Sequence, residues 1–427
     1  MTQSNKRVVI IGTGLGGLLT GAYLAMTGRD VTLLEELSLV GGRFTHIDYE
    51  GFAVPTGAFH TLPGGTHGPI YTCLRMIGME PELVETSPSF RAVIDGRAFP
   101  LYVQKGESSG IREAVGLESK SSVAARMAVV MMKNAFGLDT SVARLVKGLS
   151  PGDRAVRLFD HLTKFSAGVP AESASVLEIL RSLRIQKFGL EGFIRHGNRS
   201  LVTGILDKAQ ASGAALRMNT RVERIAVRDG QAYGVYTEDG NLIEADIVVS
   251  NAGAARTAHL LGDAAPSSFV DRIRRAVPAY GVAHSLRCRR PMHNHNSIEI
   301  PVDLDYISGI APISNVCPEL CPEGWHYSLA YQALDADSDV SEQLDSGISE
   351  LAGYIGSDIE VFNSAIYRNG HPSASISQSV GQHGSSRFPS SIPSVRNMYL
   401  VGHDVSGYGT AAEVIGDSCR RLWRRLA

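Results

Sequence analysis

The chain has 427 residues, which is long enough for more than one domain. Lys and Arg number 41 and Asp and Glu number 43, so the formal net charge of −2 excludes nucleic-acid binding through bulk electrostatics. Apolar residues make up 44% of the chain, which excludes global disorder.

Five cysteines are too few for a disulfide scaffold, and their odd number fits a reducing compartment. The N-terminus shows no signal peptide. No apolar run approaches the ~20 residues that are needed to cross a bilayer. We therefore expect a cytoplasmic protein.

The first 35 residues predict one strand–helix–strand unit. The apolar run Val8–Ile11 is typical of a strand buried on both faces of a parallel sheet. A glycine-rich turn follows at residues 12–17, and a helix over Leu18–Met26 ends before Gly28. The second strand covers Val31–Glu35 and ends in an acidic residue.

Farther along the chain, residues 66–190 are expected to be mostly helical, with breaks. Residues 214–244 read as β-structure, with a hairpin signal at Asp239-Gly240. Buried strands are predicted over Asp246–Ser250 and Met398–Gly402, and a last helix runs to the C-terminus. Strands and helices that alternate in this way indicate an α/β fold.

Gly12, Gly14 and Gly17 form a G-x-G-x-x-G motif in the context that the motif requires, after a strand and at the start of a helix. Gly12 permits the tight turn, Gly14 lets the backbone approach a pyrophosphate, and Gly17 lets helix and strand pack closely. The helix N-terminus offers N–H groups to the phosphates. Glu35 can accept hydrogen bonds from both ribose hydroxyls. The predicted cofactor-binding set here also includes the neighbouring Leu15, Gly16 and Glu36.

A second glycine pair, Gly41-Gly42, is followed by Arg43. This spacing fits a chain that passes back over the pyrophosphate, where Arg43 could form forked hydrogen bonds to it. Here the sequence resembles the FAD-binding superfamily that holds monoamine oxidases and phytoene desaturases. Those proteins carry the same glycine run, acid and GGR at this spacing, so the resemblance implies that the dinucleotide is FAD.

Three segments in the middle of the chain carry the same resemblance. Residues 192–198 resemble the family's P-x-GG segment, with a histidine where a glycine is usual. Val222 lies in a segment like the strand whose backbone touches the adenine. Residues 245–252, which include Asn251, match the strand that leads out of the FAD domain.

The C-terminal segment resembles the family's last FAD motif. In the family an acid directly follows the glycine that corresponds to Gly402, whereas His403 comes before Asp404 here, so both residues stay open as the ribityl contact. Thr410 opens a sequence with capping-box spacing at the start of the last helix. With Ala411, this N-terminus is expected to point N–H groups at the flavin N1/O2 edge, where negative charge develops on reduction.

Residues expected against the flavin ring come from two places. The stretch Gly57-Ala58-Phe59-His60 resembles the segment that runs along the flavin, and Gly57 and Ala58 are small enough for close contact. His60 is then a candidate acid/base or polar anchor on the substrate side. Tyr408 is a second candidate that could flank the ring.

The resemblance implies a Rossmann-like FAD/NAD(P)-binding domain that is discontinuous over residues 1–65, 190–255 and 385–427. Residues 66–189 and 256–384 are then inserted as a substrate domain of mixed sheet and helix, of α+β type.

The first functional hypothesis is a dehydrogenase or desaturase that removes a hydride from a C–C or C–N bond of an apolar or amphipathic small molecule, an isoprenoid being one such substrate. An amine or amino-acid oxidase is the second. The third is a non-redox flavin isomerase, or a lipid-binding protein like the GDP-dissociation inhibitors of small GTPases. The sequence leaves the substrate, the electron acceptor and the oligomeric state open.

Two further features have no assigned role in these hypotheses. The apolar stretch Met127–Met132 fits a core helix of the second domain, and it also fits a helix that lines the substrate site or makes peripheral contact with a membrane. His293 and His295 form a His-Asn-His triplet with no third ligand in view, so no metal site is expected.

Overall fold

The computed structural model describes residues 6–101, 114–116, 129, 139–149, 152–185, 191–335, 337–367 and 375–427. The stretch Met127–Met132 lies outside these residues except for Val129, so its two interpretations stay open.

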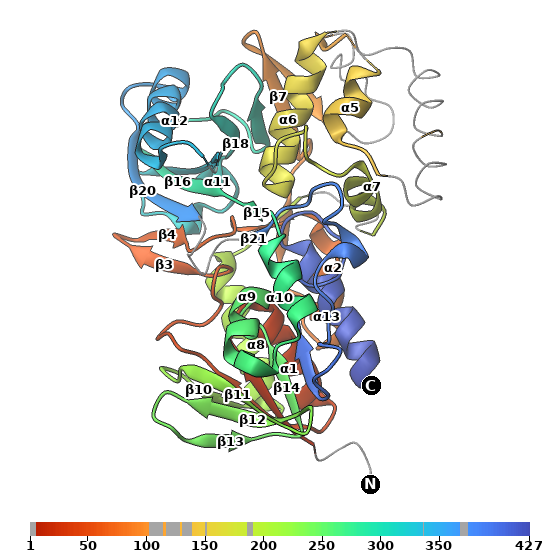
Figure 1. Cartoon of the computed structure of the whole chain (residues 1–427). Coiled ribbons are helices and arrows are strands. Elements are labelled where there is room, and N and C mark those ends of the chain that lie inside the picture. Colours follow the sequence, from red (N-terminus) through yellow and green to blue (C-terminus); the bar gives the residue numbers. More distant parts are fainter. Residues whose placement is uncertain are drawn as a thin grey trace.

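A five-stranded parallel sheet contains the first strand of the chain and is drawn in the lower half of Figure 1. In spatial order its strands are β10 (Ala215–Arg217), β2 (Asp30–Leu34), β1 (Arg7–Ile11), β14 (Ile247–Ser250) and β22 (Met398–Leu400). Strands β1, β2, β14 and β22 match the predicted strands to within two residues at each end, and β10 lies in the region predicted as β-structure.

Both faces of β1 are buried, and its residues are apolar at every position after the first. Val8 and Ile10 pack into a helical layer of α1 (Leu15–Met26), α2 (Pro69–Met76), α8 (Gly197–Ala211) and α13 (Glu413–Leu426). Val9 and Ile11 face the opposite core. That core is covered by β11 (Val222–Arg228), β12 (Gln231–Thr237), β13 (Leu242–Glu244), α9 (Ala254–Leu261) and α10 (Ser267–Arg274).

A seven-stranded mixed sheet forms the other half of the structure, at the top of Figure 1. Its spatial order is β20 (Glu360–Tyr367), β16 (Gly281–Cys288), β19 (His326–Ala333), β18 (Ile307–Ala311), β17 (Ile298–Pro301), β7 (Phe90–Ile94) and β8 (Arg97–Leu101). Nearby helices are α5 (Val142–Lys147), α6 (Asp153–Ala167), α7 (Val176–Ile185), α11 (Ile313–Val316) and α12 (Val340–Ile355). The whole is a mixed α/β structure with parallel and mixed sheets.

Smaller sheets and short helices complete the structure. They are β3 (His46–Tyr49), β4 (Phe52–Pro55), β5 (Thr61–Leu62), β6 (Leu83–Glu85), β9 (Gly192–Ile194), β15 (Pro278–Ala279), β21 (Ser375–Ile376), and the short helices η2 (Gly65–His67), η3 (Gly262–Ala264), η4 (Pro318–Leu320) and η5 (Gly384–Ser386). Strand β9 pairs with both β5 and β6, and this pairing brings residues near 60 and near 192 together.

One prediction of secondary structure needs correction. The region 66–190 is not mostly helical in its first third, because β6, β7 and β8 occupy residues 83–101. These strands form because they pair with strands that are distant in sequence. For example, β7 pairs with β17, which places Ile298 opposite Phe90. The five cysteines are free, in line with the prediction. Among the described residues, no helix has the length and apolar character that spanning a membrane requires.

Candidate functional site

The glycine-rich turn lies at the carboxyl end of β1. Gly12 has φ +90°, a conformation that favours glycine, and its N–H donates to the Leu34 carbonyl over 2.8 Å. Gly14 stands at the N-cap of α1, so no side chain caps this helix. The N–H groups of its first turn are therefore available to an anion such as a phosphate.

Two glycines of this turn leave no room for a side chain. A Cβ on Gly17 would lie 2.2 Å from the Gly12 carbonyl oxygen, and a Cβ on Gly14 would lie 2.5 Å from Oδ1 of Asn251. The Nδ2 of Asn251 donates to the Val401 carbonyl over 2.8 Å. Asn251 therefore packs behind the turn and links it to the chain that follows β22.

Glu35 directs its carboxylate at the same turn. Oε2 accepts from the N–H of Thr13 at 2.8 Å and from the Thr13 hydroxyl at 2.6 Å. Oε1 accepts from the Leu37 N–H at 3.1 Å. Because a carboxylate offers about four acceptor sites, Oε1 retains capacity for a ribose hydroxyl.

The other predicted residues around the turn have different surroundings. Leu15 is buried in the helical core, and Gly16 packs against the side chain of Asn251. Val222 is buried at the start of β11. Glu36 is exposed and pairs with a surface arginine at 3.8 Å. None of the four predicted residues lines the cavity described below.

The Gly41-Gly42 turn lies against the glycine-rich turn, so the chain does pass back over this site. Gly41 forms a parallel bridge with Gly14, and its N–H donates to the Thr13 carbonyl over 2.9 Å. A Cβ on Gly42 would lie 3.5 Å from the Gly14 Cα. The glycine-rich turn and the Gly41-Gly42 turn therefore form one compact backbone surface.

Arg43 extends from this surface into a cavity. Burial lowers the pKa of its guanidinium, while Asp404 and Tyr367 act in the opposite direction. The structure thus places a half-buried cation at the boundary between the glycine turns and the cavity.

The chain after β22 brings His403 and Asp404 to different places. Oδ2 of Asp404 accepts from the Ala254 N–H at 2.5 Å, at the N-terminus of α9. His403 lines the cavity, where burial, Arg387 and Arg43 lower its pKa well below the ordinary value. Of the two candidates for the ribityl contact, His403 is the one that reaches the cavity, and it does so as a neutral ring.

The predicted capping box at residues 410–413 does not form. Helix α13 begins at Glu413 with Ala412 at its N-cap and no side-chain cap. The carboxylate of Glu413 instead accepts from the Ile70 N–H at 2.8 Å and from the Gly64 N–H at 3.3 Å. Ile70 lies in the first turn of α2, so Glu413 caps that helix. Burial nevertheless raises the pKa of Glu413 to about 8.

Replacing Glu413 with glutamine is expected to change how stability depends on pH. The pKa of Glu413 is about 8 in the folded chain against an ordinary 4.5, so between these values the folded state holds a proton that the unfolded state has lost. Its contribution is complete below pH 4.5 and is lost as the pH rises towards 8, at roughly 1.4 kcal/mol per pH unit.

Denaturant unfolding of wild type and Glu413→Gln, followed by fluorescence at several pH values, measures this effect. The free energy of unfolding of wild type should fall relative to that of the variant as the pH rises. A constant difference across the range would mean that the Glu413 carboxylate is already ionised in the fold.

A cavity of about 310 Å³ lies between these segments and the seven-stranded sheet. Its walls are mostly apolar and aromatic, with Phe165 from α6, Tyr331 from β19 and Tyr367 from β20. Predicted residues that line it are Arg43, Gly57, Ala58, His403, Thr410 and Ala411. The cavity therefore joins the predicted flavin-side residues to the sheet of the other half.

Glu191 is an acidic residue in the cavity wall. It is 5% exposed and immediately precedes β9. Burial raises the pKa of its carboxyl to about 7, and a hydrogen bond with the Thr61 side chain limits that rise. A carboxyl with this pKa can exchange a proton at neutral pH.

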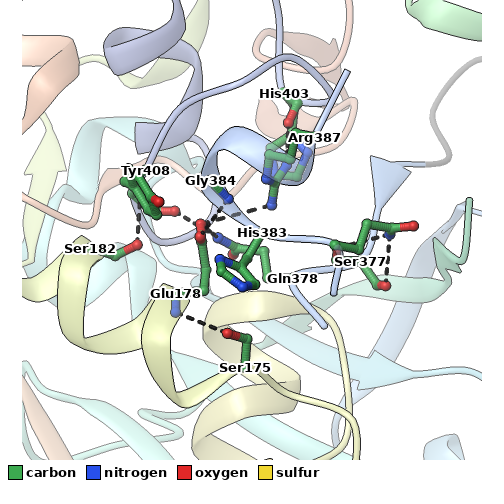
Figure 2. A network of polar contacts seen from close by, with 12 residues as sticks. Ser175, Glu178, Ser182, Ser377, Gln378, His383, Gly384, Arg387, His403 and Tyr408 are labelled. Atoms are coloured by element: carbon green, nitrogen blue, oxygen red, sulfur yellow. Dashed lines mark hydrogen bonds and ion pairs between the residues drawn. The ribbon is translucent and has the colours of Figure 1, made fainter. Parts of the chain in front are cut away.

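A buried polar network orients Gln378, another lining residue, and Figure 2 shows it around the Glu178 carboxylate. Nε2 of Gln378 donates to Oε1 of Glu178 at 2.7 Å and to the Gly409 carbonyl at 2.8 Å. Glu178 also accepts from the Gly384 N–H at 3.0 Å and lies 3.9 Å from Nη2 of Arg387. Because both amide protons are engaged, the amide orientation is fixed. Oε1 of Gln378 is a buried acceptor without a hydrogen-bond partner among the described residues.

His60, the predicted acid/base or polar anchor, and Tyr408, which was predicted to flank the ring, do not line the cavity. Nε2 of His60 lies 2.8 Å from the Ala53 carbonyl, and its Nδ1 accepts from the Asn198 N–H at 3.3 Å. Burial lowers the pKa of His60 to about 4. The Tyr408 hydroxyl accepts a hydrogen bond from Arg181. Both rings are therefore engaged in contacts within the protein.

Four polar residues that line the cavity were not predicted from the sequence. Glu191, Gln378, Tyr331 and Tyr367 belong to no motif with a recognisable spacing. Only Glu191 had an indirect signal, because it directly precedes the segment 192–198 that carries the family resemblance.

The chain is similar to several known proteins. A model of the family described as flavin containing amine oxidoreductase matches residues 15–420. An uncharacterised protein of Methanocaldococcus jannaschii is 25% identical over 94% of both chains. The neurosporene-forming phytoene desaturase of Rhodobacter capsulatus is 26% identical over 60% of this chain and 54% of its own length.

Among solved structures, an oxidoreductase from Methanosarcina mazei superposes with a TM-score of 0.85. The two chains share 22% identity, over 98% of this chain and 100% of the other. This likeness supports the fold. The match to the desaturase of Rhodobacter capsulatus spans about half of that protein's length.

Proposed function

Because the chain belongs to the flavin containing amine oxidoreductase family, we propose that this FAD-dependent oxidoreductase removes a hydride from a C–C or C–N bond of an apolar or amphipathic small molecule. The observation that carries the proposal is the cavity of about 310 Å³, whose wall joins the predicted flavin-side residues to apolar side chains. A mostly apolar cavity with a few oriented polar groups is the usual form of a small-molecule site.

The glycine-rich turn fits FAD because it offers uncapped N–H groups to a diphosphate and a carboxylate acceptor to a ribose. In this proposal, residues 1–65, 190–255 and 385–427 form a discontinuous FAD-binding domain of Rossmann type. Residues 66–189 and 256–384 form the substrate domain. When bound, FAD supplies the hydride acceptor.

Glu191 is our candidate for the group that takes the accompanying proton. As the C–H bond breaks and hydride leaves with its electron pair, a neighbouring C–H or N–H bond must release a proton and leave its electrons in the new double bond. His403 is a poor acceptor, because protonation would place a third cation beside Arg387 and Arg43. Burial and the Thr61 hydrogen bond, and no cation among the described residues, set the pKa of Glu191, and its carboxylate can form the new O–H bond.

The polar groups of the cavity also favour one branch of the substrate class. Oε1 of Gln378 is a buried acceptor without a hydrogen-bond partner in the part of the chain that the structure describes, and leaving such an acceptor unpaired costs about 1–3 kcal/mol. A substrate that carries an N–H or O–H group would satisfy it, whereas a pure hydrocarbon would not. This observation supports an amine or amino-acid oxidase as the second candidate function.

Anaerobic reduction of the flavin tests the proposed function. The holoenzyme is mixed with a panel of amphipathic amines, alcohols and isoprenoids, and the loss of flavin absorbance is followed in each case. Reduction by at least one member is expected, and oxygen and quinone are then compared as reoxidants. A flavin that no panel member reduces, in a protein that dithionite reduces normally, would count against this substrate class.

Replacing Glu35 with alanine is expected to weaken FAD binding by roughly 1–3 kcal/mol, the range for a lost hydrogen bond to a charged group. The change removes the acceptor for the ribose and also releases Thr13, which the carboxylate holds through two hydrogen bonds. Titration of the apoprotein with FAD measures the affinity. Glu342→Ala is the matched control, since Glu342 is exposed and lies on α12, beside the seven-stranded sheet. Equal affinities of wild type and Glu35→Ala would remove Glu35 from the ribose site.

A further inference from the structure

Three side chains of ligand type converge at the start of β17, outside the cavity wall. One ring nitrogen of His293, one of His295 and one carboxylate oxygen of Glu299 lie within 4.8 Å of one another. The histidines are half-buried, and Glu299 is 6% exposed. The sequence offered only the two histidines as candidates, and the fold brings the third ligand to them.

Surrounding hydrogen bonds hold this cluster in place. Nδ1 of His295 lies 3.1 Å from the Ser297 carbonyl, and the Tyr354 hydroxyl donates to Oε1 of Glu299 at 2.6 Å. The side-chain amide of Asn315 donates to the backbone carbonyls of both histidines, at 3.0 and 2.8 Å. Contacts of this kind orient the ligands in protein metal sites, where a ligating histidine commonly donates its second N–H to a carbonyl.

Lone pairs of the two histidines and of Glu299 face one another, so a cation between them would be favourable. Because Nδ1 of His295 faces a carbonyl, the ring proton of a neutral His295 belongs there, and Nε2 then points its lone pair at Oε2 of Glu299, 3.0 Å away. Nε2 of His293 is also buried and has no hydrogen-bond partner among the described residues. A proton on His295 would satisfy one of these contacts, whereas a metal ion could accept all three lone pairs.

One nearby cation opposes metal binding. Nε of Arg91 lies 3.5 Å from the same Oε2 of Glu299 and partly balances its charge. The guanidinium is expected to weaken the affinity for a dication without removing the ligands. Removing Arg91 therefore distinguishes a metal site from a simple cluster of ion pairs. Only in a metal site should the loss of this cation raise the affinity for a metal ion.

We propose that His293, His295 and Glu299 bind a divalent transition-metal ion, with Zn²⁺ as the best match to two imidazoles and one carboxylate. Water would fill the fourth position. Bound metal would fix the loop before β17, whose first residue, Ile298, donates its N–H to the carbonyl of Ser89 in the cavity wall at 2.9 Å. None of the three ligands lines the cavity, so the proposed site is distinct from it.

Calorimetric titration of the EDTA-treated, dialysed full-length protein with zinc chloride tests this proposal, and elemental analysis gives the stoichiometry. One Zn²⁺ per chain is expected, together with a rise in the thermal unfolding temperature. His293→Ala and Glu299→Gln should lose the stoichiometric site. His259→Ala, which removes an exposed histidine of α9, should keep it. No binding by wild type, or stoichiometric binding retained by folded His293→Ala, would overturn the proposal.

Two further variants test the surroundings of the metal. Tyr354→Phe removes the hydrogen bond to Glu299 and should weaken Zn²⁺ binding by about 10- to 100-fold, as outer-contact changes do in known sites. Arg91→Gln removes the opposing cation and should strengthen binding. Circular dichroism confirms that each variant is folded. Affinities that neither variant changes would show that any bound zinc lies elsewhere, which also overturns the proposal.

Discussion

Replacing Gly17 with alanine is expected to lower the FAD affinity of the folded protein by about 10- to 100-fold. The added Cβ would lie 2.2 Å from the Gly12 carbonyl oxygen and 3.3 Å from the Asn251 side chain. The first of these is a backbone atom, so the glycine-rich turn itself must move. Overpacking of this kind costs typically 1–3 kcal/mol, and the displaced turn no longer presents the α1 N–H groups as the diphosphate requires. FAD content after purification and titration of the apoprotein measure the loss.

Gly21→Ala is the matched control because it places the same methyl group in the same helix. There the nearest atom is Cδ2 of Leu33 at 2.9 Å, the end of a flexible side chain that can adjust. Both variants gain the same helix propensity, about 1 kcal/mol for glycine to alanine. Equal FAD affinities of Gly17→Ala and Gly21→Ala would show that the close contact with Gly12 does not shape the cofactor site.

Residues 7–35 were predicted most accurately from the sequence, because the residues that form these elements are close together in the chain and also pack against one another in the fold. Residues 7–35 form a strand, turn, helix and strand in direct succession, and each signal lies within a few positions of the structure it specifies. The turn at Gly41-Gly42 was also predictable, because its glycines are required by a contact with Gly14 only 27 positions earlier. Two buried faces explain why β1 reads as a continuous apolar run.

The cavity wall could not be predicted in the same way, because strands distant in sequence assemble it. Tyr331 and Tyr367 come close only because β16 pairs with both β19 and β20. The failed capping box has the same origin. The spacing of Thr410 and Glu413 was correct, but Gly64 and Ile70 compete for the Glu413 carboxylate from more than 340 positions away. Local spacing specifies an element and does not specify its tertiary partner.

Replacing Glu191 with glutamine is expected to slow flavin reduction by about 10²- to 10⁴-fold, the usual contribution of a positioned general base. The amide keeps the size of the side chain and cannot accept the proton. The pH dependence gives a second readout. Burial places the pKa of Glu191 at about 7, and only the ionised form acts as a base, so the wild-type rate should rise as the pH passes through that value. Stopped-flow reduction by a donor from the substrate panel measures both effects.

The variant Thr61→Val tests whether Glu191 acts as a base or only packs in the cavity. The Thr61 hydrogen bond favours the ionised carboxylate, so its loss should raise the pKa of Glu191 and move the rate profile to higher pH. In Glu191→Gln the rate should no longer rise with pH near 7. The thermal unfolding temperature of this variant shows whether its fold is intact. If the substrate reduces Glu191→Gln at the wild-type rate and with the same pH profile, Glu191 is not the base, although the enzyme remains a flavin-dependent oxidoreductase.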